Sequence, residues 1–129
     1  MPSVPLGVRR GVFLAYAVVL FTATHWPSLK IDGPVPRTDL WLHVGAFGAW
    51  TLLFGFAEFI GRWRDRTTPL RLIACGIVYA AMDELLQAIP VLNRFATIED
   101  YVANLVGVFA GATIILIAAR NTEPGPDGG

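Results

Sequence analysis

Two carboxylates and an amide are concentrated on one face of an apolar segment. At about 100° per residue, Asp83, Glu84 and Gln87 fall within one arc of a helix, with the amide between the acids. Pro90 then closes the segment. Carboxylates placed in this way can transfer protons, hold a metal ion or recognise a cationic group.

A second set of polar residues follows shortly after that proline. Arg94 lies in a short connection, and Asp100 opens the next apolar segment. Asn104 shares a helical face with Asp100, because the two are one turn apart. Two helices therefore direct acids, amides and an arginine towards the connection that joins them.

The composition places these polar groups in a very apolar chain. Of 129 residues, 54% are hydrophobic and 16% are charged, and the mean hydropathy is +0.55. A soluble domain carries about 25% charged residues. The formal net charge of zero gives no support to a nucleic-acid partner, and the single cysteine, Cys75, excludes an internal disulfide. One small integral membrane domain is the expected class.

Four apolar segments predict an all-α integral membrane protein, a compact bundle of four transmembrane helices. We expect the helices to cover about residues 8–26, 40–60, 70–89 and 101–119, in a single domain of residues 1–119. Residues 120–129, rich in Pro and Gly, are expected to form a disordered tail. The basic start and short apolar core also fit a signal peptide, but no convincing cleavage site follows, so we favour a retained first helix.

The distribution of basic residues predicts the orientation of the bundle. With four spans, the termini and the second connection share the side that holds Arg9, Arg10, Arg62, Arg64, Arg66, Arg71 and Arg120. The other side holds only Lys30, Arg37 and Arg94. The positive-inside rule therefore places both termini in the cytoplasm, and the first and third connections outside. The polar cluster is then expected at the outer leaflet of the cell membrane.

The same orientation brings a third helix to the cluster. Asp39 and His43 share a helical face at the outer start of the second predicted span. Three helices thus deliver polar side chains to one depth: Asp39, His43, Asp83, Glu84, Gln87, Arg94, Asp100 and Asn104. Ionisable groups below the membrane surface cost roughly 2.5–3.5 kcal/mol each on insertion scales, so by default they face the protein interior and mark function.

These residues, in this order, resemble the pattern of the VanZ-like membrane proteins. The pattern covers about residues 25–116 and consists of Asp39, His43, Asp83-Glu84-x-x-Gln87, Arg94, Asp100-x-x-x-Asn104, Gly107 and Gly111. The family is named for a protein of glycopeptide-resistance clusters that lowers sensitivity to teicoplanin, and its members are predicted four-helix membrane proteins. The resemblance implies a role in the cell envelope without supplying a reaction. Where the family often has a lysine after the aspartate, this chain has Leu40, so a basic contact there is not expected.

The favoured functional interpretation of the cluster is a binding pocket. It would take the polar head of an amphiphile, with an apolar groove between helices for the tail, and Arg94 would hold an anionic group. Membrane lipids, lipid-linked peptidoglycan precursors and teicoplanin, which carries a fatty acyl chain, are candidate ligands.

The alternative is an intramembrane enzyme that acts on a lipid-linked envelope substrate. His43 and Glu84 would share the acid/base role, while Arg94 and Asn104 would stabilise developing charge. Asp83, Glu84, His43 and Asp100 are alternatively ligands for a divalent ion. A transporter is a further alternative, which would require a homo-oligomer because four helices make a poor pathway.

A purely structural interpretation of the cluster stands beside these two. Arg94 would neutralise Glu84 or Asp100, while Gln87 and Asn104 would satisfy backbone groups of the connection. So many charged groups at one depth exceed what two packed helices need, which favours function.

Residues outside the cluster have simpler interpretations. Glu58 and Arg62 are expected to form an ion pair one helical turn apart. Gly107 and Gly111 are expected to allow close helix packing, with dimerisation as the alternative. His25 is expected to lie in the membrane interface.

Overall fold

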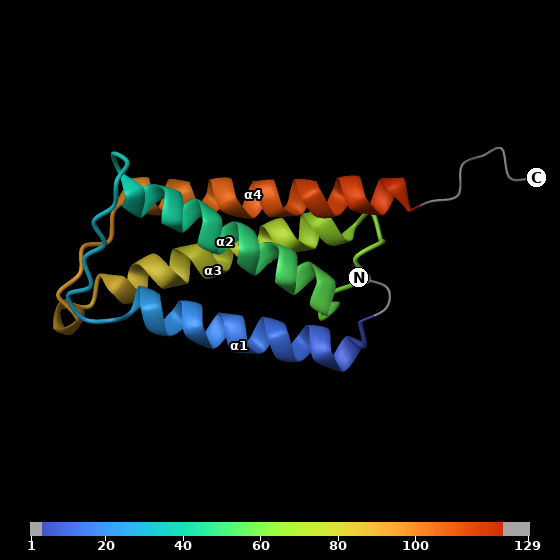
Figure 1. The fold of residues 1–129 in the computed structure, drawn as a ribbon, viewed down its shortest axis with the longest axis horizontal. Coiled ribbons are helices and arrows are strands. Elements are labelled where there is room, and N and C mark those ends of the chain that lie inside the picture. The colour runs from blue at the N-terminus through green and yellow to red at the C-terminus, as the bar shows by residue number, and fades with distance from the viewer. Residues whose placement is uncertain (1–3, 123–129) are drawn as a thin grey trace, which may run out of the picture.

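The computed structural model describes residues 4–122, and these are helical apart from the connections. The elements are α1 (Leu6–Thr24), α2 (Thr38–Ala57), α3 (Thr68–Gln87), the short 3-10 helix η1 (Pro90–Leu92) and α4 (Ile98–Asn121). The four α-helices lie along one another and alternate in direction (Figure 1). The α1–α2 and α3–α4 connections are at one end of the bundle, here called the connection end, and the α2–α3 connection is at the other.

Local backbone geometry explains where the helices begin and end. Arg37 precedes α2 with φ 57° and Glu58 follows it with φ 54°, so left-handed residues bound this helix on both sides. Thr97 caps α4, because its hydroxyl oxygen accepts a hydrogen bond from the Asp100 amide at 3.0 Å. The first three helices begin and end slightly before their predicted limits, whereas α4 extends to Asn121. The predicted tail is thus shortened at its start, and its remainder from residue 123 lies outside the described residues.

Glycines allow α2 and α4 to approach closely, and this pair of helices has the most extensive contact in the bundle. A Cβ atom on Gly107 would collide with the Val44 carbonyl oxygen and lie 2.8 Å from the Gly48 nitrogen. A Cβ on Gly111 would lie 2.8 Å from the Gly48 carbonyl oxygen. The predicted packing role of the glycine pair is therefore confirmed within the chain, between its second and fourth helices.

Aromatic side chains join α1 to the rest of the bundle. Phe13 is buried against Trp50, with ring centroids 5.8 Å apart. Trp50 in turn stacks on Tyr79 of α3 at 4.9 Å. The first predicted helix therefore packs as part of the bundle core.

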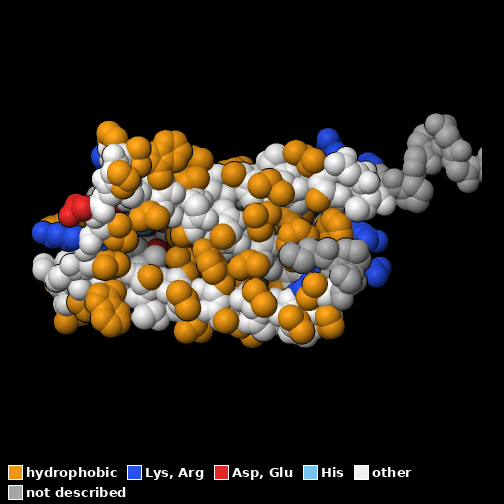
Figure 2. All heavy atoms as spheres, viewed as in Figure 1, with side chains coloured by type: hydrophobic (Ala, Val, Ile, Leu, Met, Phe, Trp, Pro, Cys, Tyr) orange, Lys and Arg blue, Asp and Glu red, His pale blue; other side chains and the backbone are white. Residues whose placement is uncertain are grey.

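The outer surface has the composition of a membrane protein. Three helices, α1, α2 and α4, are long and apolar enough to cross a membrane. Apolar side chains spread along the visible face, and charged ones gather at its two ends (Figure 2). α3 is of similar length but carries Arg71, Asp83 and Glu84, so its membrane crossing, and with it the four-span topology, stays a prediction.

Arginines of α1 bind the last turn of α2 at the end opposite the connection end. Arg9 Nη1 donates to the Phe56 carbonyl oxygen at 2.8 Å, and Arg10 Nε donates to that of Ala57 at 3.2 Å. Glu58 pairs with Arg9 at 3.6 Å. The predicted pairing of Glu58 with Arg62 is wrong, because Glu58 follows the end of α2 in a left-handed conformation and the two no longer lie on one helical face.

Candidate functional site

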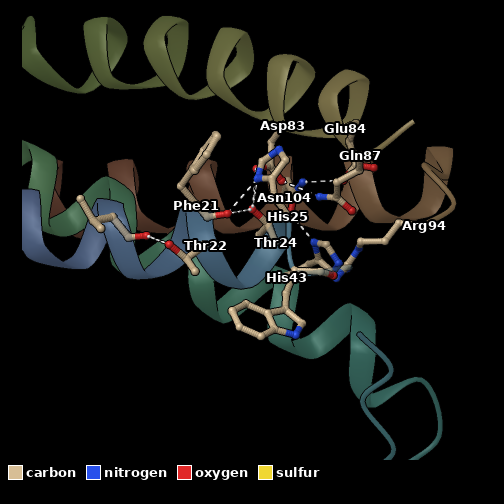
Figure 3. Close-up of polar contacts among 12 residues, drawn as sticks. Phe21, Thr22, Thr24, His25, His43, Asp83, Glu84, Gln87, Arg94 and Asn104 are labelled. Atoms are coloured by element: carbon tan, nitrogen blue, oxygen red, sulfur yellow. Dashed lines mark hydrogen bonds and ion pairs between the residues drawn. The ribbon is translucent and has the colours of Figure 1, made fainter. Parts of the chain in front are cut away.

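Asp83 is held by side chains from two helices at the connection end. It is 1% exposed, and its Oδ2 accepts a hydrogen bond from Gln87 Nε2 at 2.8 Å. Its Oδ1 accepts another, also at 2.8 Å, from the Oγ1 hydroxyl of Thr24, which is the last residue of α1. Figure 3 shows Asp83 and Gln87 meeting the end of α1. Asp83 is thus a buried, well-partnered carboxylate that joins α1 to α3.

Glu84 belongs to a separate hydrogen-bonded chain that crosses to α4 and α2. Asn104 Nδ2 donates to Glu84 Oε1 at 3.1 Å, and Asn104 Oδ1 is 2.8 Å from His43 Nδ1. Because an amide oxygen only accepts, Nδ1 of His43 carries the proton of this hydrogen bond. The amide therefore orients both the carboxylate and the imidazole.

The two ends of this hydrogen-bonded chain of side chains differ in their surroundings. Glu84 is 7% exposed, and its Oε2 is buried without a hydrogen-bond partner among residues 4–122. His43 Nε2 lies 3.9 Å from Asp100 Oδ1, and both side chains are partly exposed. The His43 imidazole and the Asp100 carboxylate thus lie next to each other at the exposed end of this hydrogen-bonded chain.

A pocket of about 670 Å³ opens beside this chain, at the connection end. Its wall contains His43 and Asp100, together with Asp39 and Arg94 from the predicted cluster. Apolar side chains, among them Leu20, Leu42, Phe47 and Phe95, form much of the rest. Charged groups of both signs and an apolar surface therefore share one concavity.

Arg94 does not neutralise the acids. It forms no ion pair within the described residues, and its Nη1 donates to the Trp26 carbonyl oxygen at 3.4 Å. Asn93 has φ 47°, and this left-handed residue sets the direction in which the connection continues to Arg94. The predicted pairing of Arg94 with Glu84 or Asp100 is therefore wrong, and its guanidinium contributes to the pocket wall instead.

Asp39 faces a different arginine. Arg37 Nε is 3.6 Å from Asp39 Oδ1, and Arg37 Nη2 donates to Glu99 Oε2 at 2.6 Å. The hydrogen bond that Arg37 donates to Glu99, more than the charge of Asp39, raises the pKa of the exposed Arg37. The Arg37–Glu99 pair links the start of α2 to the start of α4, and neither residue lines the pocket.

The first helix contributes residues that the sequence did not predict for the site. Besides Thr24, His25 contacts the cluster, with Nδ1 2.8 Å from the Phe21 carbonyl oxygen and 3.8 Å from Asp83 Oδ1. The His25 ring stacks on Phe21 at 4.2 Å. Lys30 and Asp32 of the α1–α2 connection also line the pocket. The one sequence signal for this contribution was a histidine before a proline-rich connection, and such a histidine is equally typical of a residue in the membrane interface.

The predicted residues thus separate into two layers. Asp83, Glu84, Gln87 and Asn104 are buried behind the pocket, while Asp39, His43, Arg94 and Asp100 line it. The described part of the chain contains no group of three or more His, Cys, Asp or Glu side chains arranged to hold a metal ion. Asp83 and Glu84 have different partners, so the four proposed metal ligands do not meet at one point.

Comparisons with protein families, with curated proteins and with solved structures gave no match for this chain.

Proposed function

We propose that this chain is a VanZ-like membrane protein whose pocket at the connection end binds the polar head of an amphiphile. In this proposal all four helices span the cell membrane, both termini are cytoplasmic and the pocket opens at the outer leaflet. The ligand is a lipid head group or a lipoglycopeptide such as teicoplanin, and binding it would lower sensitivity to that antibiotic.

The observation that carries the proposal is the mixed wall of the 670 Å³ pocket. Lys30 and Arg94 suit an anionic group, whereas Asp39 and Asp100 suit a cationic one. A ligand head that bears both charges would match this wall better than a simple anion or cation.

The apolar part of the wall suits an acyl chain. Leu20 at the end of α1 and Leu42 at the start of α2 belong to the wall, and both helices carry apolar side chains outward. Phe95 extends the apolar surface at the mouth, where it is 85% exposed. A head group in the pocket could therefore leave its tail between helices and lipid.

Binding of teicoplanin to the protein in lipid nanodiscs tests the proposal. Asp100→Asn should weaken binding at least tenfold, a loss of about 1.4 kcal/mol. Glu99→Gln is the matched control, since it removes a neighbouring charge outside the pocket wall and should leave affinity within about twofold. Deacylated teicoplanin should bind more weakly than the intact molecule. Equal affinity for the two forms, or for the two variants, would contradict the proposal.

The hydrogen-bonded chain from Glu84 through Asn104 to His43 favours a second candidate, an intramembrane enzyme. His43 would take a proton from the attacking group at Nε2, Asn104 would fix the ring, and Arg94 would stabilise negative charge on the substrate. Turnover of a lipid-linked pyrophosphate in vesicles, followed by mass spectrometry, separates the two candidates. His43→Gln should abolish product formation while the substrate still binds. Absence of product with the unaltered protein would contradict the enzyme and leave the binding function as the proposal.

A further inference from the structure

A second pocket lies at the end of the bundle that carries the α2–α3 connection. It has a volume of about 520 Å³ and is lined by Arg9, Glu58, Arg62, Trp63, Arg64 and Asp65. It therefore combines the start of α1 with the residues that link α2 to α3, and it shares no residue with the pocket at the connection end.

The acids of this second pocket are already partnered. Glu58 forms its ion pair with Arg9. Asp65 Oδ1 accepts hydrogen bonds from the Thr67 amide and hydroxyl, both at 2.9 Å, and the backbone hydrogen bond is the main reason that its pKa is lowered. Asp65 thus stays ionised and occupied by its own turn.

Two arginines of the pocket have no acidic partner. Neither Arg62 nor Arg64 forms an ion pair within residues 4–122, and both are exposed at the pocket. With Arg9 and Glu58 paired, the wall has an excess of positive charge. The α2 C-terminus would oppose an anion, but its last carbonyl groups accept hydrogen bonds from Arg9 and Arg10.

The backbone that carries Arg62 and Arg64 is fixed before any ligand binds. Trp63 is 8% exposed and packs edge-on against Phe56 at 5.5 Å, and the Arg64 guanidinium lies 5.1 Å from the Trp63 ring. The Arg62 carbonyl oxygen accepts hydrogen bonds from Thr68 Oγ1 at 2.7 Å and from the Asp65 amide at 2.9 Å. Binding would therefore order two side chains and no loop.

We propose that this second pocket binds the phosphate of an anionic phospholipid head group. Guanidinium groups match phosphate oxygens in geometry and charge. The position of the pocket, at the end of apolar helices and around an indole ring, is the level at which lipid head groups lie. A soluble phosphate ester shares the chemistry of the phosphate but lacks the acyl chains that would lie along these helices. The proposal does not depend on the function of the pocket at the connection end.

Retention of phosphatidylglycerol by the purified protein tests this assignment. The protein is reconstituted in phosphatidylcholine nanodiscs that contain phosphatidylglycerol, and the lipid that copurifies after detergent exchange is counted by native mass spectrometry. Arg62→Gln and Arg64→Gln should each lower phosphatidylglycerol retention about fivefold relative to phosphatidylcholine, as expected for one basic residue at an anionic surface. Arg64→Lys should restore only part of the retention.

Arg120→Gln is the matched control, because Arg120 carries the same charge in the last turn of α4 but lies outside the pocket. It should change retention less than twofold. A loss equal to that of Arg62→Gln would overturn the proposal in favour of a general surface field. Equal retention of phosphatidylglycerol and phosphatidylcholine by the unaltered protein would also overturn it. Displacement by millimolar glycerol phosphate would overturn the lipid assignment in favour of a soluble phosphate ester. The thermal midpoint of each variant is measured alongside, and retention that falls only with the midpoint would also count against the site.

Discussion

Glu84 combines two properties that rarely occur together in a purely structural carboxylate. It is almost completely buried, yet only one of its oxygens has a hydrogen-bond partner in the described part of the chain. Asp83, its neighbour in sequence, has partners for both oxygens. A buried acceptor without a partner costs about 1–3 kcal/mol, more for a charged group, so of the two α3 acids Glu84 is the one that a structural role explains less well.

Substituting Glu84 by glutamine separates function from scaffold. The variant keeps an oxygen for Asn104 and removes the charge, so the thermal midpoint should hold or rise. The affinity for teicoplanin should fall about tenfold or more, and cells that carry the variant should lose the lowered sensitivity to teicoplanin. His43→Gln should have the same two effects. Both quantities are measured on the same preparations. Unchanged sensitivity to teicoplanin in both variants would contradict a functional role for the hydrogen-bonded Glu84, Asn104 and His43.

Arg94→Ala should lower ligand affinity with little effect on stability. The side chain makes one long hydrogen bond to a backbone oxygen, so the expected cost in unfolding free energy is about 1 kcal/mol. Removal of a counter-ion from a buried pair would instead cost about 3–5 kcal/mol. Thermal unfolding in detergent distinguishes these values, and a loss in the upper range would mean that Arg94 does pair with an acid in the membrane.

At the scale of elements, the contact between α2 and α4 is the most demanding in the bundle. Gly107→Ala should destabilise the protein by about 1–3 kcal/mol, because the new methyl group meets backbone atoms of Val44 and Gly48 that cannot rotate away. Gly45→Ala is the control in α2 outside this contact, since Gly45 is exposed and nothing lies within 4 Å of its added Cβ. It should stabilise α2 by about 0.5–1 kcal/mol. Equal midpoints for the two variants would show that the helices do not pack this closely.

The helices and the central residues could be predicted because their signals are local. Apolar length defines α1, α2 and α4, and the glycine spacing in α4 predicts a close packing surface. The role of Thr24 could not be predicted, because one hydroxyl at a helix end gains meaning only from the carboxylate that α3 places beside it. The direction of Arg94 depends on the left-handed Asn93, which no periodicity encodes.

For the whole molecule, the topology of α3 is the decisive question. In a Cys75→Ser background, single cysteines at Val35 and Ala96 should react with an impermeant thiol reagent from outside, and one at Asn121 only after permeabilisation. Val35 and Ala96 are exposed in the two connections, and Asn121 is exposed at the end of α4, whereas a side chain at Gly33 would collide with Thr38. Labelling of Val35 from outside but of Ala96 only after permeabilisation would remove α3 as a span. Labelling of Ala96 and Asn121 from the same side would remove α4, and labelling of Val35 only from inside would reverse the bundle.

The partners of the two α3 acids come from opposite ends of the chain, and this has a consequence for biogenesis. Thr24 is synthesised well before Asp83, but Asn104 emerges after Glu84. When α3 leaves the ribosome, Asp83 can already bind Thr24, but Glu84 has no partner until Asn104 is synthesised. We therefore expect α3 to insert into the bilayer only together with α4, as a helical hairpin. A glycosylation acceptor placed after α3 should be modified poorly in a chain truncated at Ala96, and efficiently once α4 is present. Asn104→Leu should lower the glycosylation of the full-length chain towards that of the truncated chain. Efficient glycosylation of the truncated chain would mean that α3 inserts alone.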